Sequence, residues 1–184
     1  MQDPEAPAVV ERALRHYLSC DLAIQPSRSP VVMCIGTDRS TGDSLGPLVG
    51  STLVELGIPG DLVLGTLDEP VHAANLSDAI RRVTVTYPRP YVIAVDACLG
   101  RLESVGAIVI SKGPVKPGTG VNKDLPAVGD LHITGIVNVG GYMEYLVLQN
   151  TRLSLVFRMA KTIACGLVPA LLGVIEKPYG QGHR

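Results

Sequence analysis

Apolar residues follow two alternating patterns along the chain. Short, nearly unbroken apolar runs bounded by turn residues predict five strands, at residues 31–36, 61–67, 91–97, 106–111 and 132–139. The first and third runs are apolar up to the residues that end them, which is typical of a strand buried on both faces of a sheet. The pattern therefore favours a sheet that is covered on both sides.

The segments around these strands have apolar positions at helical spacing. They predict helices at residues 7–20, 43–57, 75–83, 140–149 and 151–173. In the last helix a single apolar stripe includes Leu153 and Phe157. The alternation of strands and helices indicates an open α/β sheet with helices on both faces. The short turn that contains Gly100 predicts antiparallel pairing of the third and fourth strands.

Ligands of open α/β sheets bind outside the carboxyl ends of the strands. In this chain the connections at that edge are residues 36–43, 67–75, 96–101 and 112–130. We therefore expect these four loops to share one crevice, and we look there for reactive side chains.

Length and composition indicate one domain. The 184 residues are 46% hydrophobic, enough for one well-buried domain and too few for two. We expect a single domain over residues 1–184 with flexible ends at 1–8 and 175–184. The 16 Lys and Arg residues nearly balance the 17 Asp and Glu residues, which argues against a nucleic-acid partner. No signal-peptide pattern and no apolar run of membrane-spanning length is present, so no membrane partner is expected.

The four cysteines are widely scattered, with no C-x-x-C pair and no histidine at ligand spacing. They are Cys20, Cys34, Cys98 and Cys165. This distribution argues against a zinc site or a disulfide framework. It is typical of reduced thiols in a cytoplasmic protein.

The glycine-bounded loop after the first strand lies where α/β proteins commonly bind phosphate. A P-loop requires G-x4-G-K-S/T, but five residues separate Gly36 from Gly42, and Asp43 and Ser44 stand where Lys and Ser or Thr would be. A carboxylate at the mouth of a helix repels phosphate, and no G-x-G-x-x-G follows a strand. The sequence therefore disfavours nucleotide binding.

A cysteine nucleophile is a weaker alternative. Cys98 follows the third strand and His72 lies in a neighbouring crevice loop, so a Cys–His pair is conceivable. A small thiol beside a strand end is more often a packing residue. We favour the packing interpretation.

Two carboxylates remain at the predicted crevice, Asp43 and Asp96. Each has a structural interpretation, Asp43 as a helix N-cap and Asp96 as the end of a strand. Their coincidence at one sheet edge favours a shared site. Two close carboxylates cannot both ionise cheaply, so one acts as an acid while the other activates water. Alternatively, both acids hold a metal ion.

Three segments carry a resemblance to a known family. They are "GTDRSTGDSLGP" (36–47), "VDACLG" (95–100) and "PGTGVNKDL" (117–125). Over roughly residues 10–173 the chain resembles the YyaC family of sporulation proteins. It is more distantly similar to the spore germination protease and the hydrogenase maturation proteases. This resemblance implies a three-layer α/β/α fold with a mixed sheet of about five strands.

The resemblance also implies an endopeptidase that acts on a protein or peptide, such as a spore protein, in the forespore or spore interior. The acids that carry hydrolysis in the germination protease match Asp43 and Asp96. Its glycine-rich Asn-Lys segment matches Gly120, Asn122 and Lys123, which would donate hydrogen bonds to the oxyanion of the tetrahedral intermediate.

The hydrogenase maturation proteases bind nickel through two acids and a histidine. The acids match Asp43 and Asp96, but the loop expected to supply the histidine has none, and His72 is a substitute from another loop. We therefore expect no cofactor. Two alternatives stay open: a non-catalytic protein that binds a peptide in the crevice, and a metal-dependent maturation-type protease. The sequence leaves the substrate, the cleaved bond, processing and the oligomeric state open.

Overall fold

A computed structural model describes residues 3–25, 27–118 and 125–175. Its centre is a five-stranded sheet in the order β2-β1-β3-β5-β4. The strands are β1 (Ser29–Cys34), β2 (Val63–Leu64), β3 (Pro90–Gly100), β4 (Ile108–Lys112) and β5 (Leu131–Val139). All neighbouring strands are parallel except β4, which is antiparallel to β5, so the sheet is mixed.

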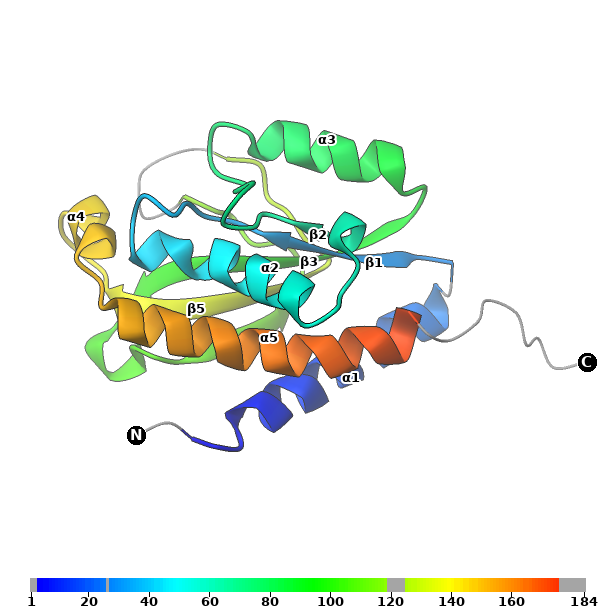
Figure 1. Cartoon of the computed structure of the whole chain (residues 1–184), viewed down its shortest axis with the longest axis horizontal. Coiled ribbons are helices and arrows are strands. Elements are labelled where there is room, and N and C mark those ends of the chain that lie inside the picture. The colour runs from blue at the N-terminus through cyan, green and yellow to red at the C-terminus, as the bar shows by residue number, and fades with distance from the viewer. Residues whose placement is uncertain (1–2, 26, 119–124, 176–184) are drawn as a thin grey trace, which may run out of the picture.

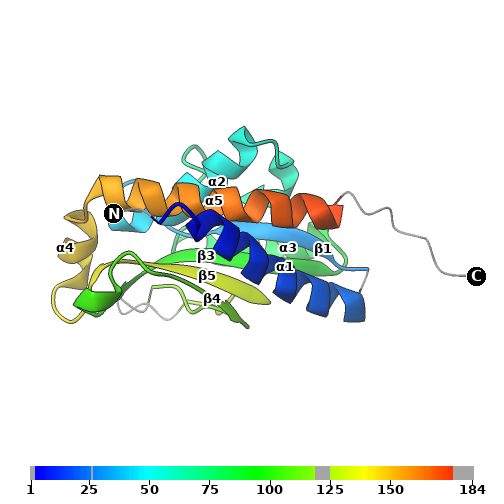
Figure 2. The same ribbon diagram turned by 90° about the horizontal axis from the view of Figure 1, so that it is seen from below.

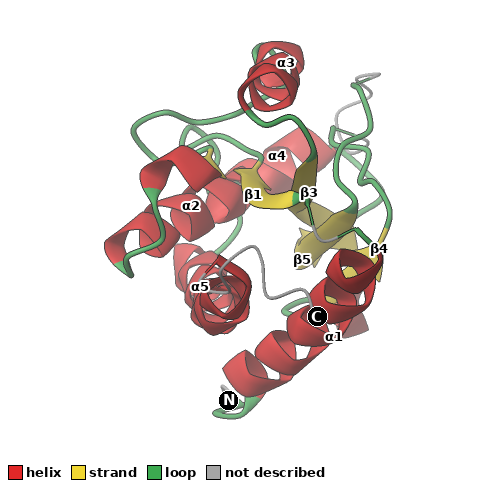
Figure 3. Cartoon of the chain, turned by 90° about the vertical axis from the view of Figure 1, so that its right-hand side faces the viewer, coloured by secondary structure: helices red, strands yellow, loops and turns green. Residues whose placement is uncertain are grey.

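Helices cover both faces of the sheet (Figures 1 and 2). They are α1 (Ala6–Ile24), α2 (Leu45–Glu55), α3 (Leu76–Thr86), α4 (Glu144–Gln149) and α5 (Leu153–Ile175). In Figure 3 the chain is seen with α3 on one side of the strands and α1, α2 and α5 on the other. The expected three-layer α/β/α architecture is confirmed.

Alternate residues of the central strands supply two separate apolar layers. On β3, Ile93 and Val95 belong to the layer under α1, α2 and α5, while Ala94 belongs to the layer under α3. Because side chains alternate along a strand, Asp96 points toward the α3 side. The same alternation places Ile35 on that side, at the end of β1.

The predicted pairing of the third and fourth strands is wrong. β5 lies between them, parallel to β3 and antiparallel to β4. Gly106 donates its N–H to the carbonyl of Ile136, which leads the chain into β4 along the outer side of β5. The half-exposed β4 takes the sheet edge, and β5, with alternate residues fully buried, takes the interior position.

Several element bounds differ from the predictions. β3 continues to Gly100, so residues 96–100 are strand rather than loop. The helix predicted from residue 140 begins at Glu144, after Gly141 and Met143 adopt positive φ angles. In α5, Leu153 and Phe157 are 60% and 55% exposed, so the buried stripe excludes them. Residues 6–8 belong to α1, and residues 1–2 and 176–184 lie outside the described residues.

By length and composition, α5 is one helix that could cross a membrane. Within its most apolar 18-residue window, however, 56% is buried inside the protein. It packs against α1, α2 and the sheet. This burial is typical of the central helix of a folded domain.

Asp130 fixes the amino-terminal edge of the sheet. Its carboxylate accepts hydrogen bonds from Arg28 (2.6 Å) and from the backbone N–H of Val92 (2.9 Å). We expect Asp130→Ala to lower the free energy of unfolding by about 1–2 kcal/mol, because the Val92 N–H and the half-buried guanidinium lose a charged partner. Urea unfolding measures the change. Asp78→Ala is the control, because it breaks an exposed pair with Arg81 and costs about 0.5 kcal/mol or less. Equal losses would contradict the assignment.

Candidate active site

The order of the strands creates a crevice at their carboxyl ends. From β1 the chain crosses to β2 on one side, and the next strand, β3, lies on the other side of β1. The connections after β1 and β3 therefore diverge, which is the arrangement that opens a ligand-binding crevice in α/β sheets. β1 ends at Cys34, opposite Val95, so Asp96 is the first residue of β3 beyond the end of β1.

Glycines hold the β1–α2 loop in a tight fold. Gly36 has a φ of +144° and donates its N–H to the carbonyl of Val71 (2.8 Å). A Cβ at Gly36 would lie 1.9 Å from the carbonyl oxygen of Asp43, and a Cβ at Gly46 would lie 2.1 Å from that of Ile35. A residue larger than glycine at either position would therefore overlap the neighbouring backbone. The backbone of the loop thus fixes the position of Asp43.

Asp43 is not a helix cap. It lies within a single 3-10 turn, η1 (Gly42–Ser44), and Ser44 is the N-cap residue of α2. Over these described helix starts, no side chain makes a capping hydrogen bond. The Asp43 side chain is half-buried, and burial raises the pKa of its carboxyl, while the Thr37 N–H and then His72 lower that pKa. The carboxyl is therefore available for chemistry.

Asp96 is a buried acid within a strand. Only 7% of its surface is exposed, and its Oδ1 accepts a hydrogen bond from the N–H of Ala97 (2.9 Å). Burial raises the pKa of Asp96 well above its usual range, and the negative charge of Asp43 raises it further. The two acids, 53 positions apart by their numbering, thus lie close enough to influence each other's ionisation.

His72 lies at the same crevice. Residue 71 forms an isolated parallel bridge with Ile35, next to the loop that carries Asp43. His72 also lines a groove of about 450 Å³ that runs along the start of α3. The groove is lined further by Glu69, Pro70, Val71, Asn75, Asp78, Ala79 and Arg82. Val71, which pairs with Ile35 at the end of β1, is thus part of the groove lining.

The structure gives Cys98 and His72 separate partners. Cys98 interacts with the side chain of Thr134, and burial together with the charge of Asp96 raises the pKa of the thiol. His72 Nδ1 accepts a hydrogen bond from Ala74. Among the described residues no hydrogen bond joins Cys98 to His72. A raised pKa disfavours the thiolate that a nucleophile needs, which agrees with a packing role for Cys98.

The structure does not describe every expected site residue. Gly120, Asn122 and Lys123 lie outside the described residues. Over the described part of the chain, no group of three or more His, Cys, Asp or Glu side chains is placed to hold a metal ion. Asp43 and Asp96 alone supply two carboxylate ligands, fewer than a protein metal site ordinarily uses.

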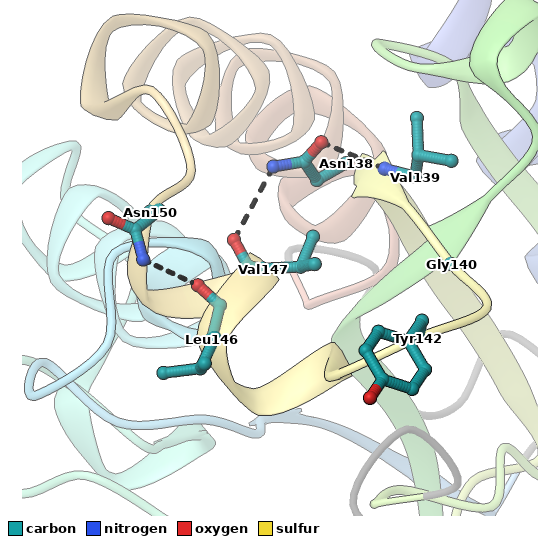
Figure 4. Close-up of a pocket in the computed structure, with 7 residues that line it drawn as sticks. All are labelled: Asn138, Val139, Gly140, Tyr142, Leu146, Val147 and Asn150. Atoms are coloured by element: carbon teal, nitrogen blue, oxygen red, sulfur yellow. Dashed lines mark hydrogen bonds between the residues drawn. The ribbon is translucent and has the colours of Figure 1, made fainter.

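Sequence reasoning missed the support behind the Asp43 turn. A Cβ at Gly42 would lie 2.9 Å from Thr151 Oγ1, and that hydroxyl accepts a hydrogen bond from Asn138 Nδ2 (3.2 Å). Asn138 also lines a second groove, of about 490 Å³, beside α4 (Figure 4). A polar Asn near the end of an apolar strand is the one signal of this role in the sequence. Ser40, in the same loop as Asp43, is buried, and its Oγ has no hydrogen-bond partner among the described residues.

The fold places the chain among proteins with the hydrogenase maturation protease architecture. The structure matches a crystal structure of the NiFe hydrogenase maturation protease HycI from Thermococcus kodakarensis KOD1 with a TM-score of 0.50 and 19% identity, over 78% of this chain and 92% of that one. At this identity the likeness shows a shared fold.

The chain belongs to the DUF1256 family, described as "Protein of unknown function", whose model matches residues 1–166. It is 56% identical over 160 residues to the "Uncharacterized protein YyaC" of Bacillus subtilis (strain 168). The aligned region covers 87% of this chain and 78% of that protein. The expected resemblance to the YyaC family is confirmed.

If the two acids share one crevice, removing the charge of one must change the other. We expect Asp43→Asn to lower the pKa of Asp96, because it removes a negative charge that opposes ionisation of Asp96. Carbon-13 NMR titration of the side-chain carboxyls measures this shift. Asp68→Asn, a change at an exposed acid, is the control. An unchanged Asp96 titration in the Asp43 variant would mean that the acids do not interact.

Burial of Asp96 also makes stability depend on pH. Because its pKa is higher in the folded protein than in the unfolded chain, the acid lowers stability progressively as the pH rises above about 4. Asparagine does not titrate. We therefore expect the stability of Asp96→Asn relative to the native protein to increase from pH 4.5 to pH 8 in urea unfolding. A difference that stays constant over this range would show that Asp96 ionises equally in both states.

Proposed function

We propose that this protein is an endopeptidase that hydrolyses peptide bonds with Asp43 and Asp96 as its acid–base pair. The observation that carries the proposal is the buried carboxyl of Asp96, whose pKa is raised by burial and by the nearby charge of Asp43. Strongly shifted acids in a crevice are a recurrent mark of catalytic sites. The fold shared with a maturation protease supports the same class of reaction.

The surroundings of the two acids divide their roles. Asp96 is the more deeply buried, so it holds a proton and acts as the general acid. Burial also raises the pKa of Asp43, but Asp43 is less buried than Asp96, and the Thr37 N–H and His72 favour its ionised form, so it acts as the general base. This separation of two neighbouring carboxyls by their environments is the general solution to acid–base chemistry near neutral pH.

In the proposed hydrolysis, one acid accepts a proton from water and the other donates a proton to the leaving nitrogen. Asp43 accepts a proton from water as the water oxygen bonds to the carbonyl carbon of the peptide. The tetrahedral intermediate collapses, the C–N bond breaks, and the leaving nitrogen takes the proton of Asp96. Transfer of the proton from Asp43 to Asp96 restores the starting state. By resemblance, Asn122 and Lys123 donate hydrogen bonds to the oxyanion.

The substrate class follows from the same proposal. The groove beside His72 includes Val71, which pairs with Ile35 next to the loop that carries Asp43, and it suits an extended peptide segment. By resemblance, the substrate is a protein of the developing or germinating spore, and the enzyme acts in the cytoplasm of the forespore or in the spore interior. No metal is required by this mechanism; in a metal-dependent version both acids would hold the ion.

Cleavage of a proteome-derived peptide library tests the function. Each new carboxyl terminus is identified by mass spectrometry, and in water enriched in oxygen-18 it gains one heavy oxygen. We expect Asp43→Asn and Asp96→Asn each to reduce cleavage at least about 100-fold, the usual effect of removing a general acid or base. Asp68→Asn is the matched control and retains cleavage. Full activity of both site variants would refute the mechanism.

The same preparation separates the two alternatives. Saturable binding of peptides without any cleavage would favour a non-catalytic binding protein, in which the acids are replaceable. Metal analysis of protein purified without a histidine tag addresses the other alternative. A stoichiometric divalent ion that is lost in both Asp43→Asn and Asp96→Asn would favour a metal-dependent protease.

A further inference from the structure

The imidazole of His72 is oriented by its own loop. Its Nδ1 accepts a hydrogen bond from the N–H of Ala74 (3.3 Å). Its backbone N–H is bound by Asn75 Oδ1 (2.8 Å), and Asn75 Nδ2 in turn donates to the carbonyl of Pro70 (3.0 Å). The carbonyl of His72 accepts the N–H of Leu76, the first residue of α3. These hydrogen bonds fix the backbone around His72 against the first residues of α3.

This arrangement determines which ring nitrogen carries the proton. A nitrogen that accepts a hydrogen bond has no hydrogen of its own, so Nδ1 is unprotonated and the neutral ring carries its proton on Nε2. The Nε2–H is then the ring's only N–H donor. His132 has the opposite arrangement, because its Nδ1 faces the carbonyl oxygen of Gly113 (2.8 Å) and must donate. The chain therefore contains an internal reference for each tautomer.

The backbone brings this ring to Asp43. The N–H of Gly36 donates to the carbonyl of Val71, and the next N–H along the chain, that of Thr37, donates to the carbonyl of Asp43. Val71, the residue before His72, and Asp43 thus bind the consecutive residues Gly36 and Thr37 of the β1–α2 loop. Burial raises the pKa of Asp43, and His72 in its protonated form lowers that pKa, which places the two side chains near each other. The other charged groups of its groove are Glu69, Asp78 and Arg82.

We propose that His72 is a positioning residue for Asp43: its Nε2–H, through one bridging water, holds the Asp43 carboxylate in the orientation of the base. This inference rests on the proposed function for its catalytic meaning, but not for its geometry. It explains how two neighbouring acids keep fixed roles. The donor beside Asp43 favours the charge there, and the proton is retained on Asp96, whose carboxyl accepts one hydrogen bond among the described residues, from the Ala97 N–H.

The first test reads the ring without any substrate. In protein labelled with nitrogen-15 histidine, long-range proton–nitrogen correlation at pH 7.5 distinguishes the two tautomers. We expect the Nε2–H form for His72 and the Nδ1–H form for His132. Asp43→Asn should shift the ring signals of His72 and leave those of His132 unchanged. A His72 ring that averages both tautomers, or that does not respond to Asp43→Asn, would overturn the inference.

The second test uses cleavage of the peptide library. Gln places an amide nitrogen near the position of Nε2, whereas Met has a similar size and no N–H donor. We expect His72→Met to lower kcat about 10- to 100-fold with KM within about twofold, as for loss of a hydrogen bond to a charged group. His72→Gln should keep kcat within about threefold. Equal losses in both variants would overturn the donor role.

The two tests fail separately. A native protein that cleaves nothing, with the expected His72 tautomer and its response to Asp43→Asn, would refute the proposed peptidase while supporting the His72–Asp43 pairing. Cleavage that depends on both acids, with an unresponsive His72 ring, would support the peptidase and refute the pairing. Thermal unfolding of both His72 variants verifies that the fold is retained.

Discussion

The structure depends on a carboxyl group placed inside a parallel sheet. Asp96 is buried in the interior strand β3, paired with Thr134 of β5 and one residue beyond the end of β1, where an apolar side chain would be the stabilising choice. Burial of an ionised carboxylate without a cation costs far more than one backbone hydrogen bond returns. The second acid, Asp43, adds to this cost. The raised pKa of Asp96 favours its protonated form, which avoids this cost, and the proposed chemistry uses that proton.

The surrounding fold supports this arrangement through backbone contacts rather than salt bridges. Gly36, Gly42 and Gly46 each lie where a Cβ would overlap a neighbouring atom, so the turn that carries Asp43 is packed directly against β1 and the residues after α4. Such contacts leave the acid little freedom to move toward solvent. A rigid turn suits general base catalysis, because the carboxylate must meet the attacking water in one orientation. The ion pairs of the chain, by contrast, include Arg28 with Asp130 at the opposite edge of the sheet.

Much of the fold could be predicted because the central strands are continuous apolar runs. Residues 31–36 and 132–139 are predictable as strands from local composition. Because loops at the carboxyl ends of parallel strands meet at one edge of the sheet, the sequence also predicts that Asp43 and Asp96 lie at one crevice. Pairing was less predictable, because the position of β5 between β3 and β4 depends on contacts between residues distant in sequence. The orientation of the His72 ring was also beyond reach, since it depends on a single hydrogen bond from Ala74.

The groups around Asp43 and Asp96 bear on whether this site suits proton transfer or metal binding. A divalent ion is held by ionised carboxylates and lowers their pKa, so a site built for it combines several acids or histidines with exposure to solvent. Here the inner acid is buried against an apolar layer, and burial is the largest cause of its raised pKa. His72 Nδ1 already accepts the N–H of Ala74, so ligation through the ring would require loss of the Nε2 proton. Under the proposed function, it is therefore the environment of the two carboxyls, and not the shared architecture, that suits this site to proton transfer.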